Sequence, residues 1–287
     1  MRKGIVSTAL VVFLSAVLYD APSLRAQTPS ASPTAIQEAF DFSRAYKDYV
    51  FMFDVYKKSH SDYLLAKAQY EAAKTLASQT KVRDATVVLL QSRDDVVVTY
   101  LTALRLKLAE SEGISDTDRD GLYTRLDSEV AWFKNHKASI PSAGTLADLT
   151  IDSTEAADHF VTTTPLIYEL LATIPFGKVD TIRMSATEIL SLTKTKVSEI
   201  RANGDHDTTV TERWILETEN KLTRSLDKEI EAQTLIASLP VKSKTTQKDN
   251  KEQSYNEVIA KLTESLQFLK EASNFMREIL KQVKTAQ

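Results

Sequence analysis

The chain contains one short segment whose residue types and spacing match a calcium-binding loop. Oxygen donors occupy alternate positions at Asp116, Asp118 and Asp120, Gly121 follows them, and a carboxylate closes the twelve-residue segment at Asp127. In such a loop alternate side chains point at one centre, the glycine permits a sharp turn, and the next residue offers its backbone carbonyl. The sequence therefore predicts a calcium site formed by Asp116, Asp118, Asp120, Leu122 and Asp127.

The twelfth position of this segment is Asp, where most loops of this kind have Glu. A loop that ends in Asp and leads into a helix resembles the loops of dockerin modules, which are extracellular and anchor enzymes to scaffolds. Dockerins carry two such loops, whereas this chain shows one, so the dockerin function does not carry over. The loop supports one functional hypothesis, a calcium-dependent binding module that uses residues 116–127.

The same residues also match the start of an α-helix. Ser115 would be its N-cap, and Asp116 and Asp118 in the first turn would complement the free amides and the helix dipole. Gly121 inside that helix would cost about 1 kcal/mol relative to Ala, which a helix tolerates. The sequence leaves both interpretations open.

Other catalytic chemistry is poorly represented. The four histidines, His60, His136, His159 and His206, fall on different segments, and none belongs to a zinc-hydrolase motif. The chain has no cysteine for a thiol nucleophile or thiolate site, and its six glycines supply no phosphate-binding loop. We therefore do not expect an enzyme. The second alternative is an extracytoplasmic hydrolase that uses paired carboxylates, because such a pair needs only spatial proximity.

The N-terminal residues predict export. Arg2 and Lys3 precede an apolar run from Ile5 to Leu18, and a polar segment follows to Ala26, the pattern of a secretory signal peptide (1–26). Residues 27–33 form a Pro/Ser-rich spacer that we expect to be disordered. The predicted location is extracytoplasmic, meaning secreted, periplasmic or cell-surface, with membrane contact only through an uncleaved signal segment.

The charge of the chain disfavours nucleic acid as a partner. The full sequence has 36 basic and 39 acidic residues, and removal of residues 1–26 takes away three basic residues and one acidic residue. The mature chain then has a net charge of about minus five, which provides no basic surface for phosphates.

Long helices must position the candidate functional side chains named above. Aromatic residues recur every seven residues at Phe42, Tyr49, Tyr56, Tyr63 and Tyr70, with Tyr46 and Phe53 between them. Such spacing puts side chains on one face only in a helix, so we predict a rod over residues 34–78. A second apolar seam starts at Val82 out of phase with the first, which predicts a turn near residues 79–81.

Five more helical segments follow. Their apolar residues span 122–133, 157–174, 179–200, 214–236 and 255–283, with stop signals at Pro175–Gly177, Asn203–Gly204 and Pro240 and a polar loop at 241–250. In the last segment we predict a seam of Tyr255, Ile259, Leu262, Leu266, Leu269, Ser273, Met276, Leu280 and Val283. The predicted fold over residues 34–287 is all-α, an elongated antiparallel bundle or coiled-coil-like series of about seven segments, with 140–144 as its candidate subdivision.

A structural or interaction protein is the leading functional hypothesis. The aromatic seam has two interpretations, a core stripe or a recognition face for a protein partner or another copy of the chain. We favour the core, and expect the seam to approach solvent at His60 and Lys67, where the alternate aromatic positions become polar.

Overall fold

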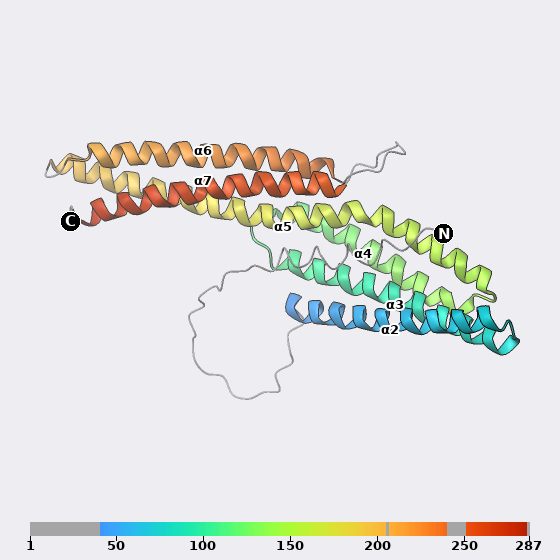
Figure 1. The fold of residues 1–287 in the computed structure, drawn as a ribbon. Coiled ribbons are helices and arrows are strands. Elements are labelled where there is room, and N and C mark those ends of the chain that lie inside the picture. The colour runs from blue at the N-terminus through green and yellow to red at the C-terminus, as the bar shows by residue number, and fades with distance from the viewer. Residues whose placement is uncertain (1–40, 205–206, 240–250, 286–287) are drawn as a thin grey trace, which may run out of the picture. The chain divides into compact units, whose positions relative to one another are not determined.

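The computed structural model describes residues 41–204, 207–239 and 251–285, which form long α-helices joined by short turns (Figure 1). The elements are α2 (Phe42–Ala72), α3 (Leu76–Ala109), α4 (Asp116–Ser139), the 3₁₀ turn η1 (Ile140–Ser142), α5 (Leu146–Asn203), α6 (Thr209–Ser238) and α7 (Lys251–Thr285). No β-strand occurs in this part of the chain, so the all-α class is confirmed for it. The predicted signal peptide, the spacer and the 241–250 loop lie outside the described residues.

Side-chain caps fix where several helices begin. The side chains of Asp41, Thr75, Ser115 and Thr145 each accept a hydrogen bond from a backbone amide in the first turn of the helix that follows. Such caps satisfy amides that have no partner within the helix, and each is typically worth about 1 kcal/mol. At the other end of α5, Gly204 adopts the left-handed conformation with φ of 76°, as the Asn203–Gly204 signal predicts.

The first hairpin exists, but its turn lies earlier than predicted. Helix α2 ends at Ala72 rather than at residue 78, and residues 79–81 fall inside α3. The reason is a capping box in which the Thr75 side chain accepts from the Ser78 amide and the Ser78 hydroxyl accepts from the Thr75 amide. Helix α3 therefore starts before its first buried apolar residue, Val82.

The aromatic seam of α2 packs against α3. Phe42 and Tyr49 are buried, and the ring centroid of Tyr49 lies 5.3 Å from that of Tyr100 on α3. Burial, with a smaller contribution from Tyr46, raises the pKa of Tyr49 to about 12, so its hydroxyl stays protonated at neutral pH. The core interpretation is confirmed for this part of the seam, and His60 and Lys67 are exposed as expected.

Helix α5 is continuous where we predicted two segments. The separate segments 157–174 and 179–200 are wrong, because both Pro165 and Pro175 lie inside one helix. Each internal proline costs about 3 kcal/mol. Burial of a large aliphatic side chain contributes about 1.5–3 kcal/mol, and six are buried around the prolines: Leu166, Ile167, Leu170, Leu171, Ile174 and Val179. Their packing outweighs the local stop signals.

Gly177, interpreted from sequence as a helix stop, serves close packing instead. It is buried within α5 at the point where the loop between α3 and α4 meets that helix. A Cβ atom on Gly177 would overlap the carbonyl oxygen of Glu112, and one on Gly113 would overlap the carbonyl oxygen of Gly177. Gly113 also has a φ of 70°, which favours glycine. The pair lets two backbones touch without intervening side chains.

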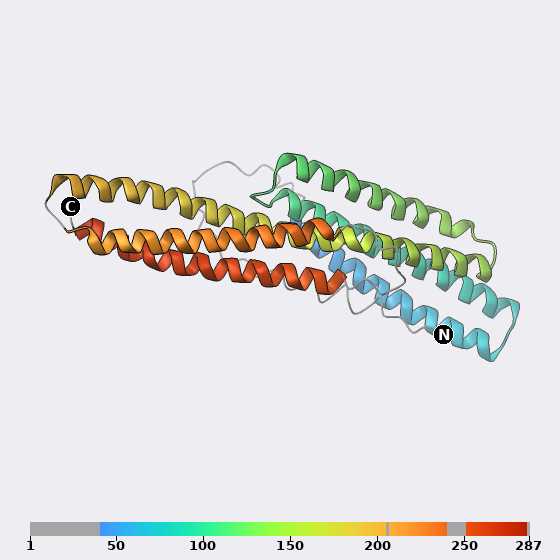
Figure 2. The same cartoon turned by 90° about the horizontal axis from the view of Figure 1, so that it is seen from above.

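Helix α5 packs against α3 and α4 and also against α6 and α7 (Figures 1 and 2). Residues Asp41–Gln287 form one compact unit, and residues 140–144 lie within it as η1 and the turn into α5. None of the described helices combines the length and apolarity that crossing a lipid bilayer requires.

Helices α6 and α7 pack along their lengths through small side chains. In α6, Thr211, Thr218, Ser225 and Ala232 are buried at seven-residue steps, which the C-cap residue Leu239 continues, and in α7 the corresponding set is Val258, Ser265, Ala272 and Ile279. The hydroxyl oxygens of Ser225 and Ser265 lie 2.8 Å apart across the interface. Because the distance between two helix axes depends on the side chains at the contact, the small residues at these positions allow α6 and α7 to approach closely.

The register of α7 differs from prediction at alternate positions. Tyr255, Leu262, Leu269 and Met276 are buried as predicted, but Leu266 and Leu280 are exposed and Ile259 and Ser273 are half-buried. The second set of core positions is shifted by one residue, to Val258, Ser265, Ala272 and Ile279. Hydrophobicity alone favours Leu over Ser, whereas the tertiary contact selects the smaller residue.

Candidate functional site

The residues of the predicted calcium loop lie in a helix. Helix α4 begins at Asp116, and the Ser115 side chain accepts from the Asp118 amide, so the capped-helix interpretation describes the observed conformation. Successive helical residues project about 100° apart, so alternate side chains do not converge on one centre. In this conformation Asp116, Asp118, Asp120, Leu122 and Asp127 do not form the predicted coordination sphere.

Three of these residues have other contacts. Oδ2 of Asp118 accepts a hydrogen bond from the Ser115 hydroxyl at 2.6 Å. Asp127 accepts hydrogen bonds from Nε and Nη2 of Arg105 on α3, at 2.8 and 3.3 Å, and the Arg105 guanidinium lies 4.4 Å from the centre of the Tyr123 ring. The Leu122 side chain is buried. Calcium binding at 116–127 would therefore require the first turns of α4 to unwind and the Arg105–Asp127 pair to separate.

A polar cluster that sequence reasoning missed lies where α3, α4 and α5 meet. Nδ1 of His136 on α4 is 2.6 Å from Oδ2 of Asp94 on α3, and both side chains are buried, Asp94 with 0% of its surface exposed. Nε2 of His136 lies 3.1 Å from the backbone carbonyl oxygen of Asp152 on α5. Three helices thus hold one imidazole ring on both of its nitrogens.

Arg93 joins this cluster from α3. Its Nη1 donates to the carbonyl and hydroxyl oxygens of Ser153, both at 3.2 Å, and its Nε lies 3.7 Å from Oδ1 of Asp94. Burial raises the pKa of Asp94, opposed by the hydrogen bond with His136 and the charge of Arg93. Burial likewise lowers the pKa of Arg93, opposed mainly by Asp94. Desolvation therefore makes this pair costly, and contacts from three helices hold it in place.

Aromatic stacking fixes the rings around His136. The Trp132 ring is nearly parallel to the imidazoles of His136 and His159, with centroid distances of 5.1 and 3.6 Å. Nε2 of His159 lies 2.7 Å from Oε2 of Glu129, which also accepts from the Thr163 hydroxyl at 2.6 Å. Both histidines therefore have restricted orientations.

Two carboxylates of α5 complete the cluster. Asp152 and Glu155 lie three residues apart, on one face of the helix, beside His136. One donor atom from each of His136, Asp152 and Glu155 lies within 4.8 Å of the other two. An imidazole nitrogen and two carboxylates are a donor set that suits divalent transition metals.

No protein-family model, curated protein or solved structure matches this chain. The geometry of the described residues is therefore the basis for functional inference.

The sequence contained only weak signals of this cluster. His60, the histidine within the aromatic seam, is exposed, and its ring centroid lies 6.2 Å from that of Tyr56 with the two rings tilted by 36°. Asp94 interrupts the apolar seam of α3, and Trp132 and His136 share a helix face at a spacing of four. Those features were visible in the sequence, but the convergence of three helices was not.

A small pocket lies at another place, between α5, α6 and α7. It has a volume of about 90 Å³ and is lined by residues that include Val197, Ile200, Thr211 and Val283. Ligand pockets for drug-sized molecules usually measure about 300–1,000 Å³. This pocket is too small for such a ligand.

Proposed function

We propose that this protein is an extracytoplasmic, non-catalytic structural or interaction protein that presents helix faces to a protein partner or to other copies of itself. The supporting observation is an apolar surface on α2, which we call the α2 face: Val50, Phe51, Leu64 and Leu65. Phe51 and Leu65 are 66% and 62% exposed. Exposed large apolar residues grouped on one element are typical of interaction sites.

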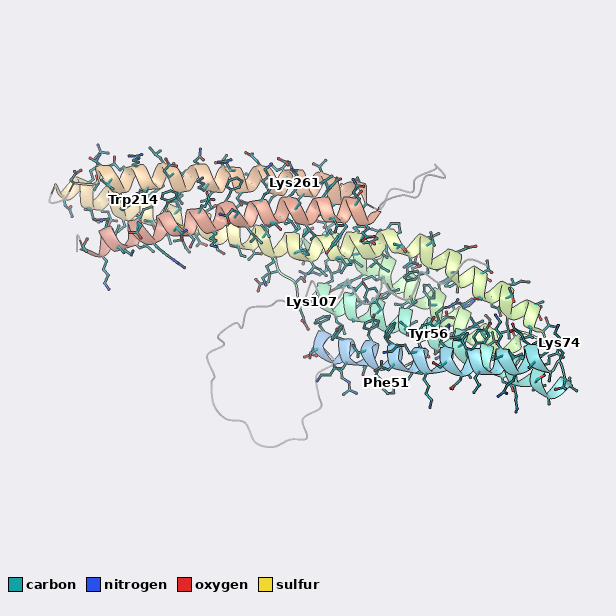
Figure 3. The ribbon with its side chains drawn as sticks, in the orientation of Figure 1. Phe51, Tyr56, Lys74, Lys107, Trp214 and Lys261 are labelled. Carbon is teal, nitrogen blue, oxygen red and sulfur yellow. The ribbon has the colours of Figure 1, made fainter. Side chains whose placement is uncertain are left out.

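The spacing of the α2 face suits a second helix. Its two apolar pairs are 14 residues apart, close to four helical turns, so they lie on the same side of α2. Figure 3 shows Phe51 on the side of α2 away from α3, whereas Tyr56 lies toward α3. Among the described elements α2 packs chiefly on α3, which leaves this face uncovered by the other described helices. A partner helix that packs here would contact both pairs at heptad-like spacing.

The proposal extends to the architecture. The hairpins are coiled-coil-like and build an elongated antiparallel bundle, and the seven-residue burial pattern of α6 and α7 supports this interpretation. The signal-peptide pattern of residues 1–26 supports export.

Sedimentation velocity of the chain from Gln27 onward, over a wide concentration range, tests the α2 face. We expect reversible self-association, or co-sedimentation with a partner recovered from the extracytoplasmic fraction, and loss of either in Phe51→Glu/Leu65→Glu. Two charges on an apolar contact oppose its desolvation.

The matched control is Ile151→Glu/Val161→Glu on α5, two residues of similar exposure at 65% and 69%. This variant should associate as the parent chain does. Equal loss in both double variants would show a general charge effect, and unchanged association in the α2 variant would reject the α2 face.

A further inference from the structure

The cluster around His136 has the features of a metal centre. Its three donor residues come from two helices, His136 from α4 and Asp152 and Glu155 from α5, and their donor atoms lie within 4.8 Å of one another. Ligands of one tetrahedral Zn²⁺ ion at about 2.1 Å stand about 3.4 Å apart. The donor atoms must therefore approach by up to about 1.4 Å, and Glu155 is exposed and able to change rotamer.

The second nitrogen of His136 is already held as metal-binding histidines require. Metal-ligating histidines usually donate the N–H of their other ring nitrogen to a carboxylate or carbonyl, which fixes the tautomer and the ring plane. Here the buried Asp94 carboxylate lies 2.6 Å from Nδ1. A metal ion bound at Nε2 would replace the contact of this nitrogen with the Asp152 carbonyl oxygen at 3.1 Å, and the ring proton would then lie on Nδ1 and be donated to Asp94. The stacked Trp132 ring restricts rotation of the imidazole further.

The charge of the cluster favours a cation. In the described part of the chain the side chains of Asp152 and Glu155 make no ion pair. Asp94 pairs with His136 and with Arg93. Arg93 directs its Nη1 to Ser153, and its Nη2 and Oδ1 of Asp94 are buried without a hydrogen-bond partner. The cluster thus holds three carboxylates, those of Asp94, Asp152 and Glu155, and one arginine, and a divalent ion would reduce the excess negative charge.

We propose that His136 Nε2 and the carboxylates of Asp152 and Glu155 bind one divalent transition-metal ion such as Zn²⁺, with Asp94 as the residue that positions His136. Three protein ligands leave coordination positions for water or for a donor from a partner. The Asp152 carbonyl oxygen, 3.1 Å from Nε2, is a fourth donor within reach. Ca²⁺ is a poorer match, because it prefers six to eight oxygen ligands. This site is separate from the α2 face, so rejection of one proposal leaves the other unchanged.

Isothermal titration of the untagged, chelator-treated chain with ZnCl₂ tests the proposal. We expect one ion per chain, and loss of affinity by about 100-fold or more in Asp152→Asn/Glu155→Gln, whose exposed or half-exposed side chains can change without damage to the core. Asp94→Asn should weaken binding by about 10- to 100-fold, and a thermal melt establishes that this variant remains folded.

Asp116→Asn/Asp120→Asn is the matched control, because it removes the same two negative charges from exposed positions of α4. It should bind Zn²⁺ as the parent does. Absence of binding by the parent chain, unchanged affinity in Asp152→Asn/Glu155→Gln, or equal loss in the control would each overturn the proposal.

Trp132 offers a second readout at the site. The chain has two tryptophans, so Trp214→Phe leaves Trp132 as the only indole. Because this ring stacks on His136, bound Ni²⁺ should quench its emission, with saturation at one ion per chain. Quenching that persists in Asp152→Asn/Glu155→Gln would place the ion elsewhere and reject these ligands.

Discussion

At the scale of single residues, a charged node fixes the contact between α5, α6 and α7. Glu229 on α6 is 2% exposed, occupies a position one heptad from the buried Leu222, and accepts from Nε of Arg183 on α5 at 2.8 Å. The hydroxyls of Ser225 and Ser265 also donate to Glu229, each at 3.1 Å. A buried carboxylate with this many donors is specific to one helix register, which is the best-attested use of buried polar groups.

Removal of one charge of the Arg183–Glu229 pair should lower the free energy of unfolding more than removal of both charges. We expect Arg183→Met to lower the free energy of unfolding by about 3–5 kcal/mol, because Glu229 remains buried without its cation. Arg183→Met/Glu229→Leu should recover most of that loss, since neither charge is then buried. Urea denaturation of the three proteins measures the difference, and a double variant as unstable as the single one would contradict the account.

At the scale of elements, two helical glycines have opposite roles. Gly177 in α5 touches the α3–α4 loop, whereas a Cβ atom on Gly121 in α4 would meet nothing within 4 Å. From the sequence, Gly177 was interpreted as a helix stop, and Gly121 either as a calcium-loop position or as a tolerated residue inside a helix. The contacts around each glycine decide whether the fold requires a residue without a side chain at that position.

The same substitution at these two glycines should change stability in opposite directions. Gly177→Ala should destabilise by about 1–3 kcal/mol, because the new methyl group overpacks against the Glu112 carbonyl. Gly121→Ala should stabilise by about 1 kcal/mol, the difference in helix propensity. Thermal melting with and without CaCl₂ measures both, and a calcium-dependent stabilisation that Gly121→Ala abolishes would favour the loop over the helix at 116–127.

At the scale of the whole described unit, α5 links the helices on either side of it. Its residues contact α3 and α4 through the His136 cluster and contact α6 through Arg183. A helix shared in this way couples the stability of the elements that pack on it, because loss of either set of contacts exposes part of its buried face.

We therefore expect unfolding in a single transition. Trp132 lies in α4 and Trp214 in α6, so Trp214→Phe and Trp132→Phe report separately on the two sides of α5. Their fluorescence midpoints in urea should coincide with each other and with the loss of helical circular dichroism. Midpoints that differ would show that α6 and α7 unfold independently of α3 and α4.

Much of the local structure was predictable because its causes are local. The seven-residue aromatic repeat predicted the face of α2 that packs on α3, Ser115 predicted the cap of α4 as one of two interpretations, and Asn203–Gly204 predicted the end of α5. Caps and helical periodicity depend on residues within about one or two turns, so a linear sequence contains them in full.

The sequence by itself determined the helical class and the end of α5, whereas tertiary structure decided the continuity of α5, the register of α7 and the His136 cluster. Pro175 and Gly177 signal a stop unless the packing of α5 is known, and Ser265 is a poor core residue unless Ser225 faces it. Asp94 and His136 are 42 residues apart in the chain. Their encounter depends on how three helices pack, and long-range packing energies are not encoded in local spacing.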